Sequence, residues 1–252
     1  MFNAMFLKKE LKEYIKTPKL LIIMCLFIFF SIVSPLTARY MNELLALLAE
    51  DVQITFPDPT LADAWAQYFK NMSSICLIVY LIIMTGAVSQ EKSKGSILLV
   101  LTKRVSRFNF LFSKLLGGIF IFTICYISSI LISGLYAYLL FDGFIYQGLW
   151  ISLLMMWLMG IFFTSLSIFF SIITKTPTVS ALFSFLGYAV LAILNVIPNV
   201  AKFNPSGGIN LINEMLIGQV STTDNLVNLI FTLIGSIVLF IISFLIFKKQ
   251  EI

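Results

Sequence analysis

The sequence predicts an all-α integral membrane protein with six transmembrane helices. Apolar residues make up 60% of the 252 residues, charged residues only 12%, and the mean hydropathy is +1.00. A water-soluble fold of this length needs a polar surface that such a composition cannot supply. A helix of about 20 residues spans the hydrocarbon core of a bilayer. Six segments without Asp, Glu, Lys or Arg are long enough: 20–38, 71–90, 115–141, 143–174, 176–201 and 225–247.

The distribution of basic residues predicts the orientation of these helices. Cytoplasmic loops of membrane proteins carry an excess of Lys and Arg. Placing the N-terminus inside puts most of the 17 basic residues on the cytoplasmic side and most acidic residues outside. With six spans, both termini are therefore expected in the cytoplasm. The net charge of +5 reflects this topology and an attraction to anionic membrane lipid, so we expect no nucleic-acid partner.

Residues 1–18 precede the first span and are predicted to form an amphipathic helix. Its apolar face is expected to carry Leu7, Leu11, Tyr14 and Ile15. Its opposite face is expected to carry six charged residues: Lys8, Lys9, Glu10, Lys12, Glu13 and Lys16. Such a helix lies in the headgroup region of the membrane, and Pro18 then redirects the chain into the first span. The helix is a membrane anchor or an elbow that transmits motion, and the two roles are compatible.

Two longer segments are predicted on the outer side. In the acidic segment 39–70, residues 61–69 are expected to form a short interfacial helix that carries Trp65, Tyr68 and Phe69. In segment 199–224, residues 209–217 are apolar enough to re-enter the membrane among neighbouring helices, and the alternative is a surface loop with an interfacial helix. No internal repeat is evident, so residues 1–252 are expected to form a single membrane domain.

Several kinds of chemistry are missing from the sequence. There is no histidine, the commonest general base and metal ligand, and no zinc-type cluster of Cys and carboxylates. No Ser or Cys has a base at motif spacing, and no G-x-x-x-x-G-K-[ST] loop is present to bind nucleotide phosphates. We therefore expect no catalytic residues, metal or cofactor in this chain. The spans also lack the charges that ion-coupled pumps use, so the energy for any transport would come from a partner.

A charged segment between the second and third spans, residues 91–107, combines two features. Gly95 permits a sharp turn, and Ser96 is a suitable N-cap for a short helix through Thr102. The apolar surface of that helix is too short to cross a membrane and consists of Ile97, Leu98, Val100 and Leu101. Basic residues follow it: Lys103, Arg104, Arg107 and Lys114. This arrangement suits docking in a groove of a soluble protein. An interfacial helix on lipid headgroups explains it equally well.

This segment resembles the signature of ABC-2-type permeases. In that signature Glu-x-x-x-Gly-Thr precedes an apolar run, and Leu-Thr-x-Pro-Val-Ser-Arg follows it. Ser96 replaces the threonine here, and Arg104 stands where the family usually has proline. The matching positions are Glu91, Gly95, Leu101, Thr102, Val105, Ser106 and Arg107. The resemblance extends to the amphipathic start, to residues 34–40 after the first span, and to the six-span layout.

The resemblance implies a half-transporter that pairs with a second permease copy, as a homodimer or a heterodimer. It also implies a separate ABC ATPase subunit that holds ATP and Mg²⁺. Residues 1–18 would be an elbow helix and residues 91–107 a coupling loop. The residues implied in ATPase coupling are Glu91, Gly95, Ser96, Leu98, Leu101, Thr102 and Arg107. The cargo would be an amphipathic or hydrophobic peptide, lipid or antibiotic, exported across a bacterial cytoplasmic membrane.

Two other functions remain open at this point. The first is an ion-coupled secondary transporter, which the uncharged spans disfavour. The second is a non-transporting membrane scaffold or sensor, which would not retain an ATPase under mild detergent extraction.

Overall fold

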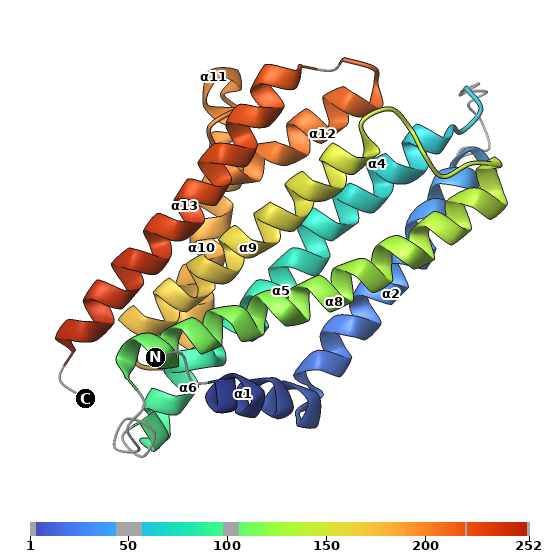
Figure 1. Ribbon diagram of the computed structural model, residues 1–252. Helices are drawn as coiled ribbons and strands as arrows, with labels where there is room; N and C mark the ends of the chain where they lie inside the picture. Colours follow the sequence, from blue (N-terminus) through green and yellow to red (C-terminus); the bar gives the residue numbers. More distant parts are fainter. Residues whose placement is uncertain (1–3, 44–56, 98–105, 220, 251–252) are drawn as a thin grey trace, which may run out of the picture.

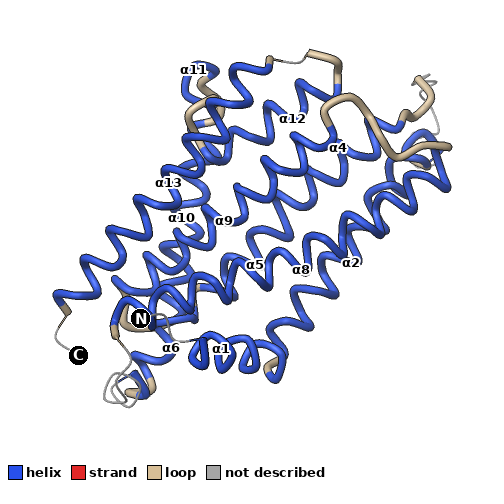
Figure 2. The backbone as a smooth tube through the Cα atoms, viewed as in Figure 1, coloured by secondary structure: helices blue, strands red, loops and turns tan. Residues whose placement is uncertain are grey.

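The computed structural model describes residues 4–43, 57–97, 106–219 and 221–250. Within these ranges the chain forms helices and connecting loops, without β-strands (Figures 1 and 2). Six of the helices described are long and apolar enough to cross a membrane. The predicted all-α class with six candidate membrane spans is therefore confirmed. Helix α1 and the C-terminal end of α13 lie at the same end of the bundle as α6 (Figure 1).

The helices follow the predicted order, with differences at their ends. The second span is one long helical segment, Leu61–Ser93, which contains a π-helical turn. In chain order the elements are α1 (Ala4–Lys16), α2 (Pro18–Arg39), α4 (Leu61–Asn71), η1 (Met72–Cys76), α5 (Leu77–Met84), α6 (Gly86–Ser93), α8 (Arg107–Phe141), α9 (Leu149–Ile173), α10 (Pro177–Leu194), α11 (Pro198–Ala201), η2 (Pro205–Gly207), α12 (Gly208–Leu216) and α13 (Thr222–Lys249).

Local sequence signals explain where several of these helices begin. Proline occupies the first turn of α2 and of α10, where its missing N–H costs nothing. At the start of α4, Thr60 and Asp63 form a reciprocal capping box. The side chains of Ser106 and Ser221 accept hydrogen bonds from backbone N–H groups at the starts of α8 and α13.

Residues 61–69 are not the short interfacial helix that the sequence suggested. They form most of α4, which continues through η1 into the second span. Trp65, Tyr68 and Phe69 are buried in the main hydrophobic core. The Trp65 indole donates a hydrogen bond to the Phe144 carbonyl at 3.0 Å, and the Tyr68 hydroxyl lies 2.7 Å from the Ser129 hydroxyl. Tyrosine and tryptophan tolerate burial when their polar atoms are paired in this way, so hydropathy alone misassigned them.

The outer segment 199–224 contains the short elements α11 and η2 and the helix α12. Helix α12 packs against α4 and α9 (Figure 1). It buries Leu211, Ile212 and Met215. This packing agrees with a helix held among its neighbours. Re-entry into the membrane stays a prediction.

Helices α8 and α9 approach closely at Gly160, and this contact gives a stability prediction. A Cβ atom added there would overlap the ring of Phe122, which is fully buried. Gly160→Ala is expected to destabilise the protein by about 1–3 kcal/mol, the usual effect of overpacking a core. Thermal unfolding of the detergent-purified protein measures this. Gly134→Ala in α8 is the matched control, because nothing lies within 4 Å of its added Cβ, and equal effects of the two changes would contradict the expectation.

Candidate functional site

The predicted coupling loop, residues 91–107, begins within the last turn of α6 and ends at the first residue of α8. Helix α6 ends at Ser93, and Gly95 adopts a φ of +68°, which confirms the sharp turn expected there. The Ser96 hydroxyl lies 3.4 Å from the Glu91 carbonyl oxygen. Leu98, Leu101 and Thr102 lie outside the described residues, so the docking helix stays a prediction.

Ile97, which was expected on the apolar docking surface, is instead buried. It belongs to a hydrophobic cluster beneath the loop with Phe6 of α1, Phe110 of α8 and Phe247 of α13. The rings of Phe110 and Phe247 stack with centroids 5.6 Å apart. Ile97 therefore anchors the start of the loop to the protein and is not available to a partner.

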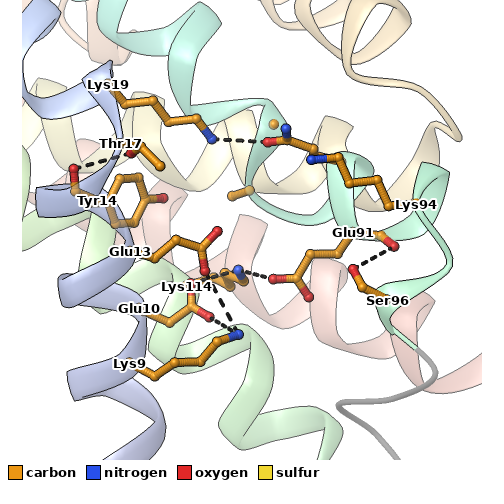
Figure 3. Close-up of a pocket in the computed structure, with 13 residues that line it drawn as sticks. Lys9, Glu10, Glu13, Tyr14, Thr17, Lys19, Glu91, Lys94, Ser96 and Lys114 are labelled. Atoms are coloured by element: carbon orange, nitrogen blue, oxygen red, sulfur yellow. Dashed lines mark hydrogen bonds and ion pairs between the residues drawn. The ribbon is translucent and has the colours of Figure 1, made fainter.

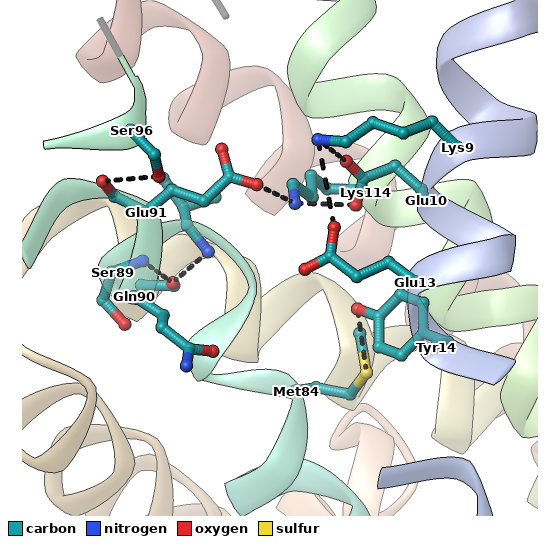
Figure 4. Close-up of polar contacts among 12 residues, drawn as sticks. Lys9, Glu10, Glu13, Tyr14, Met84, Ser89, Gln90, Glu91, Ser96 and Lys114 are labelled. Carbon is teal, nitrogen blue, oxygen red and sulfur yellow. Dashed lines mark hydrogen bonds and ion pairs between the residues drawn. The ribbon is translucent and has the colours of Figure 1, made fainter. Parts of the chain in front are cut away.

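Glu91 points into the protein and meets a lysine of α8. Its carboxylate lies 2.5 Å from the Nζ atom of Lys114, in α8. On the other side of the same Nζ atom, the carboxylate of Glu10, in α1, lies at 2.6 Å. Figure 4 shows Lys114 between the two carboxylates. We call these three residues the Glu10–Lys114–Glu91 cluster.

Two expectations from the sequence are wrong at this cluster. Glu10 was placed on the charged outer face of the N-terminal helix, and Lys114 was grouped with the exposed basic residues of the loop. Both side chains are buried. Phe6, Glu10 and Tyr14 are spaced four residues apart and share the face of α1 that packs on α8. That spacing was the available signal, although nothing local in the sequence indicated the partner of Glu10.

The cluster is short of positive charge and of hydrogen-bond donors. Two carboxylates share one ammonium group, and Oε1 of Glu10 and Oε2 of Glu91 are buried without a hydrogen-bond partner in the part of the chain described. Lys9 Nζ lies 3.7 Å from Oε1 of Glu10, beyond hydrogen-bond distance. Burial raises the pKa of the Glu10 carboxyl, and the attraction of Lys114 opposes this.

The raised pKa of Glu10 predicts a pH dependence of stability. The folded protein binds the proton of the Glu10 carboxyl more tightly than the unfolded chain does. The stabilisation that this protonation provides is therefore fully present below the ordinary pKa of 4.5 and is lost as the pH rises through the raised pKa. Lys114, Lys9 and Glu91 act on the group electrostatically. Glu10→Gln is expected to remove this part of the pH slope, as measured by thermal unfolding from acidic to neutral pH. Identical slopes in both proteins would show that Glu10 does not titrate in this range.

A cavity of about 280 Å³ opens beside the cluster (Figure 3). The Tyr14 hydroxyl donates a hydrogen bond to Met84 Sδ at 3.6 Å, and burial raises the pKa of this tyrosine. Lys19 Nζ donates to Oε1 of Gln90 at 3.1 Å, which links α2 to α6. The cavity is lined by both charge types, including Lys9, Glu10, Glu13, Lys19, Glu91, Lys94 and Lys114.

The carboxylates of Glu10, Glu13 and Glu91 are close enough to suggest a metal site. Their ligand oxygens lie within 4.8 Å of one another. Lys114 lies between Glu10 and Glu91, however, and Lys9 Nζ lies 3.9 Å from Glu13. These ammonium groups repel a cation from the same oxygens, so we assign no metal here.

Arg107, at the far end of the loop, is bound to the protein's own C-terminal helix. Its Nη1 atom donates to the carbonyl oxygens of Phe247, Lys248 and Gln250 at 3.0, 2.6 and 2.9 Å. A cation at a helix C-terminus satisfies carbonyls that have no partner in the helix and is favoured by the helix dipole. Lys92 reaches the same region, donating to Oε1 of Gln250 at 2.8 Å and to the Ile172 carbonyl oxygen. Both ends of the loop are thus fastened to the end of α13.

The four apolar residues of the N-terminal helix do not share one environment. Tyr14 is buried in the main core, whereas Ile15 is 68% exposed. Leu7 and Leu11 are half-buried and lie eight and four residues before Ile15, respectively. Helix α1 therefore has an inner face with Phe6, Glu10 and Tyr14, and beside it an apolar stripe of Leu7, Leu11 and Ile15.

Comparison with known protein families shows which family the chain resembles. The family described as ABC-2 family transporter protein matches residues 4–252, nearly the whole chain. No curated protein matches the chain at a significant level. Together with the six apolar helices, the family match supports a multi-pass membrane protein that acts as an ABC transporter permease. The chain belongs to the ABC-2 family of transporter proteins.

Proposed function

We propose that this chain is the membrane-spanning permease subunit of an ATP-driven exporter. The observation that carries the proposal is the family match over residues 4–252 in a chain whose own sequence has no nucleotide-binding loop. The ATP and Mg²⁺ would be bound by a partner ABC ATPase subunit, and this chain would supply no catalytic residue or cofactor.

The ATPase would dock on the coupling loop, residues 91–107. Leu98 and Leu101 would enter an apolar groove of the ATPase, and Thr102 would lie beside them. Gly95 and Ser96 would direct the loop away from α6. Glu91 and Arg107 face the protein and not the partner, so their part in coupling would be to hold the two ends of the loop.

The proposed orientation is supported by the distribution of charges between the two ends of the bundle. We place α1, the loop and both termini in the cytoplasm of a bacterial cell, because the lysines and arginines gather there. Helix α1 would lie at the membrane surface as the elbow helix, with Leu7, Leu11 and Ile15 toward lipid and its exposed lysines toward anionic headgroups.

Transport would require a second permease copy, identical or related, with the path between the two. Residues 1–252 would act as one ABC-2 transmembrane domain. The cargo would be an amphipathic or hydrophobic molecule of the peptide, lipid or antibiotic class, exported across the cytoplasmic membrane.

Deleting the gene for this chain tests the direction and class of transport. We expect an amphipathic or hydrophobic compound to accumulate inside the cells, as measured by mass spectrometry of cell extracts, and to fall again when the wild-type chain is restored. Restoring a chain with aspartate at positions 98 and 101 is the control for dependence on the ATPase. A compound that becomes depleted inside the deletion cells would indicate uptake and would overturn the exporter assignment.

A further inference from the structure

The Glu10–Lys114–Glu91 cluster joins α1 to two elements that lie much later in the sequence, α6 and α8. Helix α1 packs against α8 and α2. Lys114 then connects α1 to the end of α6, because its ammonium group contacts Glu10 and Glu91 at 2.6 and 2.5 Å. Glu91 lies four residues before the turn at Gly95, near the start of the coupling loop. The same ammonium group therefore holds both α1 and the start of the loop.

The charges of the cluster make this connection depend on Lys114. Lys114 is the one lysine or arginine that is buried among the residues described. Without it, the buried carboxylate of Glu10 and the largely buried carboxylate of Glu91 would have no cation between them, and like charges within 4.8 Å of each other repel strongly. The exposed Lys9 cannot replace it, because it lies 3.7 Å from Glu10 and makes its other ion pair with Glu13.

Apolar packing also holds α1, but without the same directional preference. Phe6 and Phe110 contact each other with ring centroids 5.7 Å apart. The attraction between apolar groups is non-directional, whereas two short ion pairs to one nitrogen set the positions of three side chains. Buried ionic groups that fix one arrangement over its alternatives are known in other proteins.

We propose that Lys114 is a positioning residue that locks helix α1 to the start of the coupling loop, so that the two move as one unit. This inference rests on the proposed function, since it assigns the loop a motion that α1 shares. Lys114 has no role in contacting cargo or the ATPase under this proposal.

Spin labels on α1 and α6 test the lock directly in the purified permease. Lys12 and Ser93 are exposed, so cysteines at these positions accept labels after Cys25, Cys76 and Cys125 are replaced by alanine. Pulsed electron–electron double resonance then gives the distribution of distances between the two labels. A single narrow distribution is expected for the otherwise unchanged protein and for Lys9→Met, the matched control. Lys114→Met is expected to lose the single narrow peak.

A triple variant keeps the test valid if Lys114→Met alone folds poorly. Combining Glu10→Gln, Lys114→Met and Glu91→Gln leaves no unpaired buried charge, and this variant is also expected to lose the narrow peak. A narrow peak in either Lys114 variant would overturn the proposal, because packing alone would then hold α1. The measurement uses the permease without its ATPase. A failed lock is therefore distinct from a failure of the proposed function, which would appear as a wild-type chain that binds no ATPase.

Discussion

Replacing Leu98 and Leu101 together with aspartate is expected to detach the ATPase subunit and to abolish the ATP hydrolysis of the complex. Burying a leucine side chain is worth about 1.5–3 kcal/mol, and a carboxylate in the same groove adds an unpaired buried charge. Two such changes amount to a loss of affinity of at least about 100-fold. Affinity capture of the tagged permease from mild detergent, followed by an ATP hydrolysis assay, measures both effects.

The control for this variant is an exposed apolar residue at the opposite end of the protein. Ile217, at the end of α12, is 71% exposed, and Ile217→Asp is expected to leave ATPase binding unchanged. Both variants should reach the membrane in amounts similar to wild type, because neither alters a span. Full ATPase binding and hydrolysis in the Leu98 and Leu101 double variant would refute the assignment of this loop as the docking site.

Replacing Lys114 with methionine is expected to destabilise the protein by about 3–5 kcal/mol. Removing one partner of a buried ion pair leaves an uncompensated charge, and here it leaves two carboxylates together. Lys9→Met removes a half-exposed lysine from the same region, and a change of at most about 1 kcal/mol is expected. Thermal unfolding of the three proteins in one detergent at neutral pH gives the comparison.

Neutralising the whole cluster separates the effect of charge from the effect of packing. Replacing an entire buried ion cluster by well-packed apolar residues is often neutral or stabilising. The Glu10→Gln, Lys114→Met and Glu91→Gln triple variant removes the uncompensated charge but keeps two polar amides, so it should recover part of the lost stability. Equal destabilisation in the triple and single variants would mean that the lysine stem, and not its charge, supports the fold.

The six spans were predictable from the sequence because long apolar segments indicate helices that cross the membrane. The limits of two spans were not predictable, because charged residues were taken as the boundaries of the spans. Helix α8 runs through Lys114, whose charge is paired, and α4 runs through Asp63 and Lys70 into the second span. Local hydropathy cannot show that Lys114 has a distant partner, and exposed charges such as Asp63 and Lys70 do not end a helix, so both helices begin earlier in the chain than predicted.

The candidate site was only partly predictable for the same reason. The motif located Glu91 and Arg107 at the ends of the loop, and Gly95 at its turn. The sequence did not show that Glu91 faces Glu10 and Lys114, or that Arg107 binds the end of α13, because these partners are far away along the chain. Glu10 was assigned to the wrong face because its neighbours in the sequence are lysines, although it shares the spacing of Phe6 and Tyr14.

The most direct test of the central claim is whether this chain binds an ABC ATPase subunit. The tagged chain is purified from its native membranes in mild detergent, its partners are identified by mass spectrometry, and ATP hydrolysis is measured with and without vanadate. The account predicts an ATPase subunit that carries a nucleotide-binding loop, with hydrolysis that vanadate inhibits. A chain that purifies intact with no ATPase, and with no hydrolysis above background, would contradict it.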